Sequence, residues 1–171
     1  MSTTPQLSVV VPVHNEEDNV APLVGEIVTA LRGVIDFEIV YVDDTSKDAT
    51  LQRLHDLQAT VPELRVIRHL SNAGQSTAVR NGVKAARAPW IATLDGDGQN
   101  DPADIPKLLA QRDSAAVDIK LFAGWRVNRQ DSGSKRWASK FANGIRSRML
   151  RDATPDTGCG IKLFERAAFL D

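Results

Sequence analysis

Short β-branched runs alternate with segments of helical periodicity through the first hundred residues, and this alternation constrains the fold more than any other feature. The apolar runs at residues 7–13, 37–43, 64–70 and 90–95 are nearly continuous, as strands are when helices cover both faces of a parallel sheet. Residues 20–32, 49–58 and 75–86 carry apolar side chains at helical spacing. The order βαβαβαβ predicts an α/β fold with an open, mostly parallel, doubly wound sheet.

The pattern is less regular after residue 102. We expect a helix at about 103–111, a strand at about 117–125 and a last strand at 161–164. A chain of 171 residues, 42% of them hydrophobic, is long enough to bury one core, so we expect residues 1–171 to form a single domain. Because the sequence stops where another helix begins, we also expect this domain to be truncated at its C-terminus.

Composition excludes several classes of protein. With 21 basic and 22 acidic residues the net charge is −1, so no global field attracts nucleic acid, and we expect no nucleic-acid partner. The single cysteine, Cys159, excludes an internal disulfide framework and fits a reducing, cytoplasmic location. We see no signal peptide, and the apolar run at 7–13 is far shorter than the roughly 20 residues that cross a bilayer. We therefore expect a chain that does not span a membrane.

Acidic and polar residues follow the predicted strands, at the edge where open α/β sheets bind ligands. After the fourth strand, Asp95 and Asp97 flank Gly96, so two carboxylates emerge from one turn. Their mutual repulsion would be relieved by a hard cation such as Mg²⁺ or Mn²⁺, to which Gln99 would add a neutral oxygen. The alternative is that these aspartates only form a turn and cap a helix.

The second strand ends in VDD, and a carboxylate at Asp44 would accept hydrogen bonds from a nucleobase or a ribose hydroxyl. The alternative is that Asp44 or Ser46 caps the next helix. The acids of HNEED, after the first strand, could likewise bind a ligand or simply occupy the first turn of a helix, where the helix dipole favours acids.

Taken in order, these loops resemble family 2 inverting glycosyltransferases, which have the GT-A nucleotide-binding fold. The similarity is to the polyprenyl-phosphate sugar transferases, the dolichol-phosphate mannose synthase group. The matching stretches are VVVPVHNEEDN, VDDTSKDAT, SNAGQSTAVRNGVKAA, LDGDGQNDPADIPKLL, GWRVNRQDS and DTGCGIKLF. Position 45 is Thr where the family more often has Gly or Asn, and Asn100 with Asp101 replaces a commoner pair.

The resemblance implies a metal-dependent transfer of a sugar, with inversion, from GDP-mannose or a UDP-sugar to a dolichyl or undecaprenyl phosphate. Mg²⁺ or Mn²⁺ would be bound by Asp95, Asp97 and Gln99. The implied donor-site residues are Pro12, His14, Glu16, Asp43, Asp44, Asp95, Gly96 and Arg129, with Asp44 meeting the base and Asp43 supporting its loop. The implied catalytic residues are Asp97, Arg126 and Asp156. Arg126 and Arg129 would meet phosphate oxygens, and Asp156 would orient the acceptor or act as a weak base.

The segment from Lys135 to Arg151 carries basic residues and no acid, and an apolar residue recurs on it every four positions, at Trp137, Phe141, Ile145 and Met149. This pattern suits a helix that lies on an anionic membrane surface, which would place the protein peripherally on the cytoplasmic face of the membrane. The alternative is that the apolar stripe packs onto the sheet and only the cations meet solvent.

Other functions stay open at this point. A family 2 transferase that acts on a saccharide acceptor would share these loops, and a non-catalytic nucleotide-sugar-binding module would keep VDD without needing both acids of DGD. A nucleotidyltransferase would normally have a basic, glycine-rich loop after the first strand, where this chain has the acidic HNEED.

Overall fold

The computed structural model describes residues 4–124 and 161–171. Its elements in chain order are β1 (Leu7–Val13), α1 (Val20–Leu31), β2 (Phe37–Asp43), α2 (Thr50–Gln58), β3 (Leu64–Arg68), α3 (Gln75–Ala85), β4 (Trp90–Thr93), the 3₁₀ turn η1 (Pro102–Asp104), α4 (Ile105–Ser114), β5 (Leu121–Ala123), β6 (Lys162–Glu165) and α6 (Arg166–Leu170).

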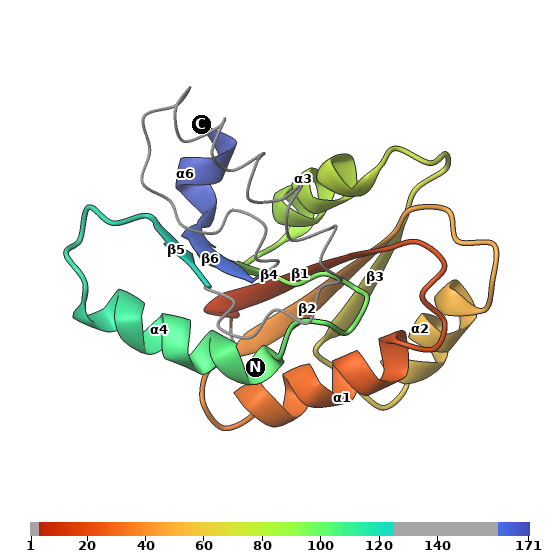
Figure 1. The fold of residues 1–171 in the computed structure, drawn as a ribbon, viewed down its shortest axis with the longest axis horizontal. Coiled ribbons are helices and arrows are strands. Elements are labelled where there is room, and N and C mark those ends of the chain that lie inside the picture. Colours follow the sequence, from red (N-terminus) through yellow and green to blue (C-terminus); the bar gives the residue numbers. More distant parts are fainter. Residues whose placement is uncertain (1–3, 125–160) are drawn as a thin grey trace, which may run out of the picture.

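The strands form one six-stranded sheet in the order β3-β2-β1-β4-β6-β5. The first four strands are parallel, and β6 runs antiparallel to both of its neighbours, β4 and β5. Helices α1, α2 and α4 lie on one face of the sheet, and α3 and α6 lie on the other (Figure 1). The predicted mostly parallel, doubly wound α/β sheet is confirmed, and the carboxyl ends of β1, β2 and β4 meet at one edge.

Both faces of the central strands are buried, which explains why their sequences are nearly continuous in apolar residues. Val9 and Val11 of β1 pack in the core beneath α1, together with Leu23 and Ile27. Val10 points to the other face, into the smaller core beneath α3.

Helix α3 approaches the sheet closely through Gly82. A Cβ atom at this position would collide with the Val10 side chain and would lie 3.1 Å from Cγ2 of Val42. Because a larger residue does not fit, the glycine fixes how near α3 lies to β1 and β2.

The boundaries differ from the sequence-based prediction mainly where strands give way to loops. β3 ends at Arg68 instead of residue 70, and β4 ends at Thr93 instead of residue 95. The strand expected at 117–125 is confined to Leu121–Ala123 at the sheet edge, and Val117 is 91% exposed. The helix expected at 103–111 begins as a 3₁₀ turn and continues to Ser114. Apolar residues in the sequence therefore predict the end of a strand less well where no neighbouring strand or helix covers them.

A buried carboxylate, Glu38, links the strands at the other end of the sheet, where β1, β2 and β3 begin. Glu38 of β2 is 1% exposed; its Oε1 accepts hydrogen bonds from the Ser8 hydroxyl at 2.7 Å and the Arg87 N–H at 2.7 Å. Its Oε2 accepts from the Arg65 and Arg87 guanidinium groups, both at 2.8 Å. Burial alone would raise the pKa of Glu38, but the Arg87 N–H, Arg65, Ser8 and the Arg87 side chain hold it below the ordinary 4.5.

Candidate functional site

A cavity of about 330 Å³ opens at the carboxyl edge of β1, β2 and β4. It is lined by Pro12, Val13, His14, Glu16, Asp44, Gln75, Ala78, Asp95, Gly96 and Asp97. The fold therefore brings together most of the residues that the sequence analysis assigned to a donor site. Asp43 and Gln99 are not among the lining residues.

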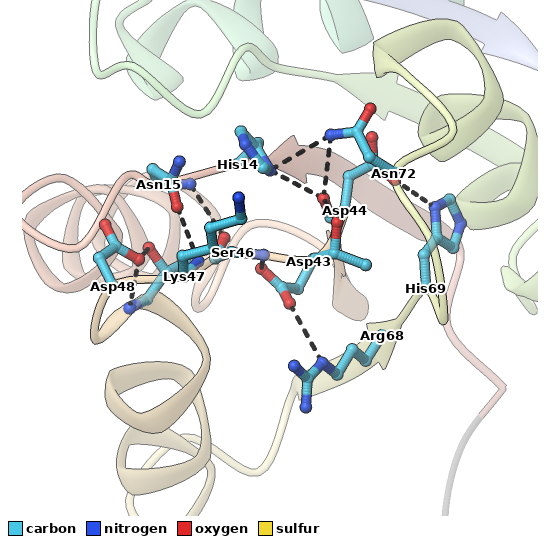
Figure 2. Close-up of polar contacts among 12 residues, drawn as sticks. His14, Asn15, Asp43, Asp44, Ser46, Lys47, Asp48, Arg68, His69 and Asn72 are labelled. Atoms are coloured by element: carbon cyan, nitrogen blue, oxygen red, sulfur yellow. Dashed lines mark hydrogen bonds and ion pairs between the residues drawn. The ribbon is translucent and has the colours of Figure 1, made fainter.

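The loops after β1 and β2 brace each other beside this cavity (Figure 2). The Asn15 N–H donates to the Ser46 hydroxyl at 2.9 Å, and the Lys47 N–H donates back to Asn15 Oδ1 at 2.8 Å. Glu17 Oε2 accepts from the Ala49 N–H at 3.0 Å, at the start of α2. Glu17 of HNEED therefore has a structural role, because it holds the loop after β2.

Helix α1 begins at Val20, as predicted, but the residue before it does not cap it. Asn19 has helical dihedral angles and makes no side-chain cap. Its amide donates instead to Glu16 Oε2 at 2.6 Å, which holds the Glu16 carboxylate at the cavity wall.

Asp44 is 4% exposed and its side chain turns toward the loop after β3. Oδ1 accepts from His69 Nδ1 at 2.7 Å and the Ala73 N–H at 2.9 Å, and Oδ2 accepts from the Gly74 N–H at 2.7 Å. Burial would raise the pKa of Asp44, but the Ala73 N–H, His69 and the Gly74 N–H together hold it below the ordinary 3.8. The Asp44 side chain therefore contacts the loop after β3 and does not cap α2. Because its pKa is lowered, Asp44 is ionised at neutral pH.

The backbone around Asp44 is also fixed. His14 Nδ1 donates to the Asp44 carbonyl at 2.8 Å, since a carbonyl oxygen can only accept (Figure 2). The neighbouring Asp43 is fully buried, and its Oδ1 accepts from the Ser46 N–H at 3.2 Å, so Asp43 supports this loop. Arg68 Nε lies 3.8 Å from the other oxygen of Asp43.

The loop after β4 presents its acids to the cavity. Asp95 Oδ1 accepts from the Gln75 amide at 2.8 Å, whereas the exposed Asp97 accepts from the Gln99 N–H at 3.1 Å. Gly96 lies against the end of β1, where a Cβ would come within 2.8 Å of the Pro12 carbonyl oxygen. A glycine at this position lets the two aspartates flank the end of β1.

The chemistry of these residues fits a hard divalent cation. Asp95 and Asp97 both line the cavity and offer carboxylate oxygens, the ligand type that Mg²⁺ and Mn²⁺ prefer. Among the described residues no group of three or more His, Cys, Asp or Glu side chains comes together to hold a metal. A cation at Asp95 and Asp97 would consequently need further oxygen ligands from a bound phosphate or water. Gln99 is exposed, and its recorded contact is through its backbone N–H, so its role as a ligand stays a prediction.

Several predicted residues lie outside the described part of the chain. These are Arg126, Arg129, Asp156 and the basic segment 135–151.

Residues of α3 and of the loop before it also organise the site, although none of them was predicted to do so. His69 contacts Asp44, Gln75 contacts Asp95, and the Asn81 amide lies 3.0 Å from His69 Nε2. Gln75 and Asn81 lie within the stretch SNAGQSTAVRNGVKAA, which resembles the family, and His69 follows the third strand, but neither signal assigns a contact to an individual side chain.

The sequence matches the family described as "Glycosyl transferase family 2" over residues 8–171. It is 37% identical over 162 residues to a dodecaprenyl-phosphate galacturonate synthase of Rhizobium johnstonii, a match covering 93% of this chain and 47% of the relative. It is 36% identical over 163 residues to an undecaprenyl-phosphate 4-deoxy-4-formamido-L-arabinose transferase of Pseudomonas fluorescens, covering 94% of this chain and 47% of the relative. The chain thus spans about half the length of these relatives.

Solved structures with the same fold include a mannosyltransferase from Pyrobaculum calidifontis in complex with GDP-Man and Mn²⁺, with a TM-score of 0.73 and 19% identity over 99% of this chain and 47% of that one. Another is glucosyl-3-phosphoglycerate synthase from Mycobacterium tuberculosis in complex with Mn²⁺, UDP and phosphoglyceric acid, with a TM-score of 0.71 and 19% identity over 95% of this chain and 56% of that one. Both similarities support the predicted GT-A fold.

No helix within the described residues has the length and hydrophobicity needed to span a bilayer.

Proposed function

This chain belongs to glycosyl transferase family 2, and we propose that it carries the donor site of an enzyme that moves a sugar, with inversion, from a nucleotide diphosphate sugar to a polyprenyl phosphate. One observation carries the proposal. A single cavity is lined both by the buried carboxylate Asp44 and by the acids Asp95 and Asp97. A nucleotide sugar has matching ends: a base with N–H donors and a negatively charged diphosphate.

At the base end, Asp44 accepts an N–H of the nucleobase, and Pro12, His14 and Glu16 form the wall of the pocket. Asp43 acts indirectly, by holding the loop that carries Asp44. Because the two neighbouring loops brace each other, this end of the site is preorganised and little ordering is needed when a nucleotide binds.

At the diphosphate end, Asp95 and Asp97 hold Mg²⁺ or Mn²⁺, with Gln99 as a further oxygen ligand. When bound, the cation stabilises the negative charge that develops on the departing nucleoside diphosphate. Gln75 holds Asp95 through its 2.8 Å hydrogen bond and so restricts the orientation of this carboxylate at the cavity.

The acceptor side of the proposal rests on sequence and on the named relatives. A lipid monophosphate has a second pKa near 6, so its oxygen is largely ionised at neutral pH and needs no strong general base. Arg126 and Arg129 would bind phosphate oxygens, and Asp156 would orient the acceptor. The segment 135–151 would lie on the cytoplasmic face of the membrane, where such a lipid is presented, and residues 1–171 would act as one GT-A domain.

The test is a transfer assay with the 171-residue chain, Mn²⁺, a panel of UDP- and GDP-sugars, and undecaprenyl phosphate in detergent. We expect release of nucleoside diphosphate and a glycosylated lipid that require both the metal and the lipid. Transfer to a saccharide in place of the lipid would support the saccharide-acceptor alternative. Tight nucleotide binding without transfer to any acceptor would support a binding module instead.

A further inference from the structure

The helices on the two faces of the sheet differ in charge. Helices α3 and α6, on one face, contain no acidic residue. Helices α1, α2 and α4, on the other face, contain one each, Glu26, Asp56 and Asp113. We propose that the face formed by α3 and α6 docks on an anionic lipid surface. This contact goes beyond the proposed function, because it lies outside the segment 135–151 and needs neither a nucleotide nor a metal.

Helix α3 carries cations on the side that faces away from the sheet. Gly82 is buried against the strands, whereas Arg80 and Lys84 are exposed and lie one helical turn apart. No hydrogen bond or ion pair within the described part of the chain engages either of these two side chains. Arg87, just beyond the helix, pairs with the buried Glu38 through Nε, and its side chain is 55% exposed. These three cations form a basic row that can meet an anionic partner.

Helix α6 lies against the end of α3, so its side chains belong to the same surface (Figure 1). The Arg166 guanidinium, at the start of α6, donates to the Val83 and Lys84 carbonyls, both at 2.9 Å. Phe169 and Leu170 of α6 are 44% and 40% exposed. Exposed apolar side chains and unpaired cations therefore occur on one face, which is the combination by which peripheral proteins bind anionic membranes.

An apolar cavity of about 350 Å³ on this face adjoins the candidate site. Val79 of α3 lines it together with the stacked rings of Phe164 and Phe169, whose centroids are 5.1 Å apart. Asp95 lines both this cavity and the polar cavity at the ends of the strands. Docking through α3 and α6 would therefore place one side of the site next to lipid.

The apolar side chains favour a lipid surface over a nucleic acid as the partner. A duplex would meet the basic row with its phosphates, but it would leave Phe169 and Leu170 against water. In a lipid surface the same two side chains enter the boundary between head groups and acyl chains, while the cations stay among the head groups. One surface thus satisfies both features of the face.

The test is co-sedimentation of the 171-residue chain with vesicles, in the absence of nucleotide, metal and polyprenyl phosphate. The vesicles contain phosphatidylcholine alone or phosphatidylcholine mixed with phosphatidylglycerol. We expect binding only to the anionic vesicles, and weaker binding at high salt, because salt screens exposed charges. Equal binding to both kinds of vesicle would overturn the proposal, as would no binding to the anionic ones. Because no donor is present, the result is independent of the proposed function.

Lys84→Glu and Lys107→Glu form a matched pair. Both replace an exposed lysine on a helix, and the two helices, α3 and α4, lie on opposite faces of the sheet. A cation near an anionic leaflet strengthens binding by about fivefold. We therefore expect Lys84→Glu to weaken binding to the anionic vesicles at least about fivefold, and Lys107→Glu to leave it nearly unchanged. Equal binding by the two folded variants would remove α3 from the contact.

Thermal denaturation checks the fold of both variants. If Lys84→Glu does not fold, Arg80→Glu takes its place, because an acid four residues before Lys84 forms a pair that favours the helix. Binding of a short DNA duplex that is lost in Lys84→Glu, without binding to anionic vesicles, would assign the basic row to nucleic acid and overturn the proposal.

Leu170→Ser tests the part played by the apolar side chains, with Val34→Ser as the control. Both residues are exposed in the protein, and Val34 follows α1 on the other face. Because burial of an apolar side chain in lipid strengthens binding, we expect Leu170→Ser to weaken binding to the anionic vesicles about threefold or more, and Val34→Ser to have almost no effect. A Leu170→Ser protein that binds as tightly as the unchanged chain would overturn the contact of α6 with lipid.

Discussion

At the scale of single residues, the carboxylates of this protein differ in how much of their hydrogen-bonding capacity the protein itself uses. Glu38 accepts four hydrogen bonds and Asp44 accepts three, and both are almost fully buried. Asp97 is exposed at the cavity and accepts one from its own loop. Glu38 lies away from the cavity and has all four of its contacts within the protein, which indicates a structural role, whereas Asp44 and Asp97 line the cavity, where a ligand can reach them.

Replacing Glu38 with Gln should lower the free energy of unfolding at pH 7 by about 2 to 4 kcal/mol, because the amide cannot satisfy both guanidinium groups in a buried site. Urea denaturation measures this change. Since the folded pKa of Glu38 lies below 4.5, its contribution is present above about pH 4.5 and is lost as the pH falls through the folded pKa. The difference between the two proteins should therefore shrink under acid conditions. A difference that stays constant down to pH 3 would contradict this assignment.

Thr45 has a strained backbone conformation, and it stands where the family more often has Gly or Asn. Its φ is +63°, a region disfavoured for a β-branched residue and better tolerated by Asn. Thr45→Asn should raise the free energy of unfolding by about 1 kcal/mol, or the melting temperature by about 2 to 4 °C. Thermal denaturation is the measurement, and a lower melting temperature would indicate that the 2.6 Å contact of the Thr45 hydroxyl with the Asp44 carbonyl outweighs the strain.

At the scale of elements, α3 links the core to the site. Its middle packs against β1 and β2 at Gly82, and its N-terminal end holds Asp44 through the Gly74 N–H and Asp95 through Gln75. The sequence predicted this helix to within one residue from its periodicity, yet its contacts with both aspartates could not be predicted. They depend on how close α3 lies to the sheet, which a single glycine sets through three-dimensional packing.

Gly82→Ala should therefore affect stability and ligand binding together. The added methyl group would overlap the Val10 side chain, so we expect a loss of about 1 to 3 kcal/mol in the free energy of unfolding and weaker binding of the nucleoside diphosphate. Gly25→Ala in α1 is the matched control, because a Cβ there meets nothing within 4 Å and alanine favours a helix by about 1 kcal/mol. Equal stability of the two variants would show that α3 has room to shift.

At the scale of the whole molecule, the sheet topology explains why so much of the site could be predicted. Pro12, Asp44 and Asp95 lie far apart in sequence, but each follows or ends a parallel strand, so strand order alone places them at one edge. The Glu38 cluster at the opposite edge could not be predicted in the same way. Its partners come from β1, β3 and the loop after α3, and an isolated Glu in a strand gives no sign of which cations will surround it.

The central claim is that Asp95 and Asp97 form the metal-dependent half of a nucleotide-sugar site, and Asp97→Asn tests it most directly. Calorimetry would compare nucleotide binding with and without Mn²⁺, using UDP or GDP, whichever binds more tightly. Asp104→Asn is the control, because Asp104 pairs with Lys107 outside the cavity. We expect Mn²⁺ to strengthen binding by about tenfold, or about 1.4 kcal/mol, in the unchanged chain and the control, and to have almost no effect in Asp97→Asn. Full stimulation by Mn²⁺ in a folded Asp97→Asn protein would contradict the account.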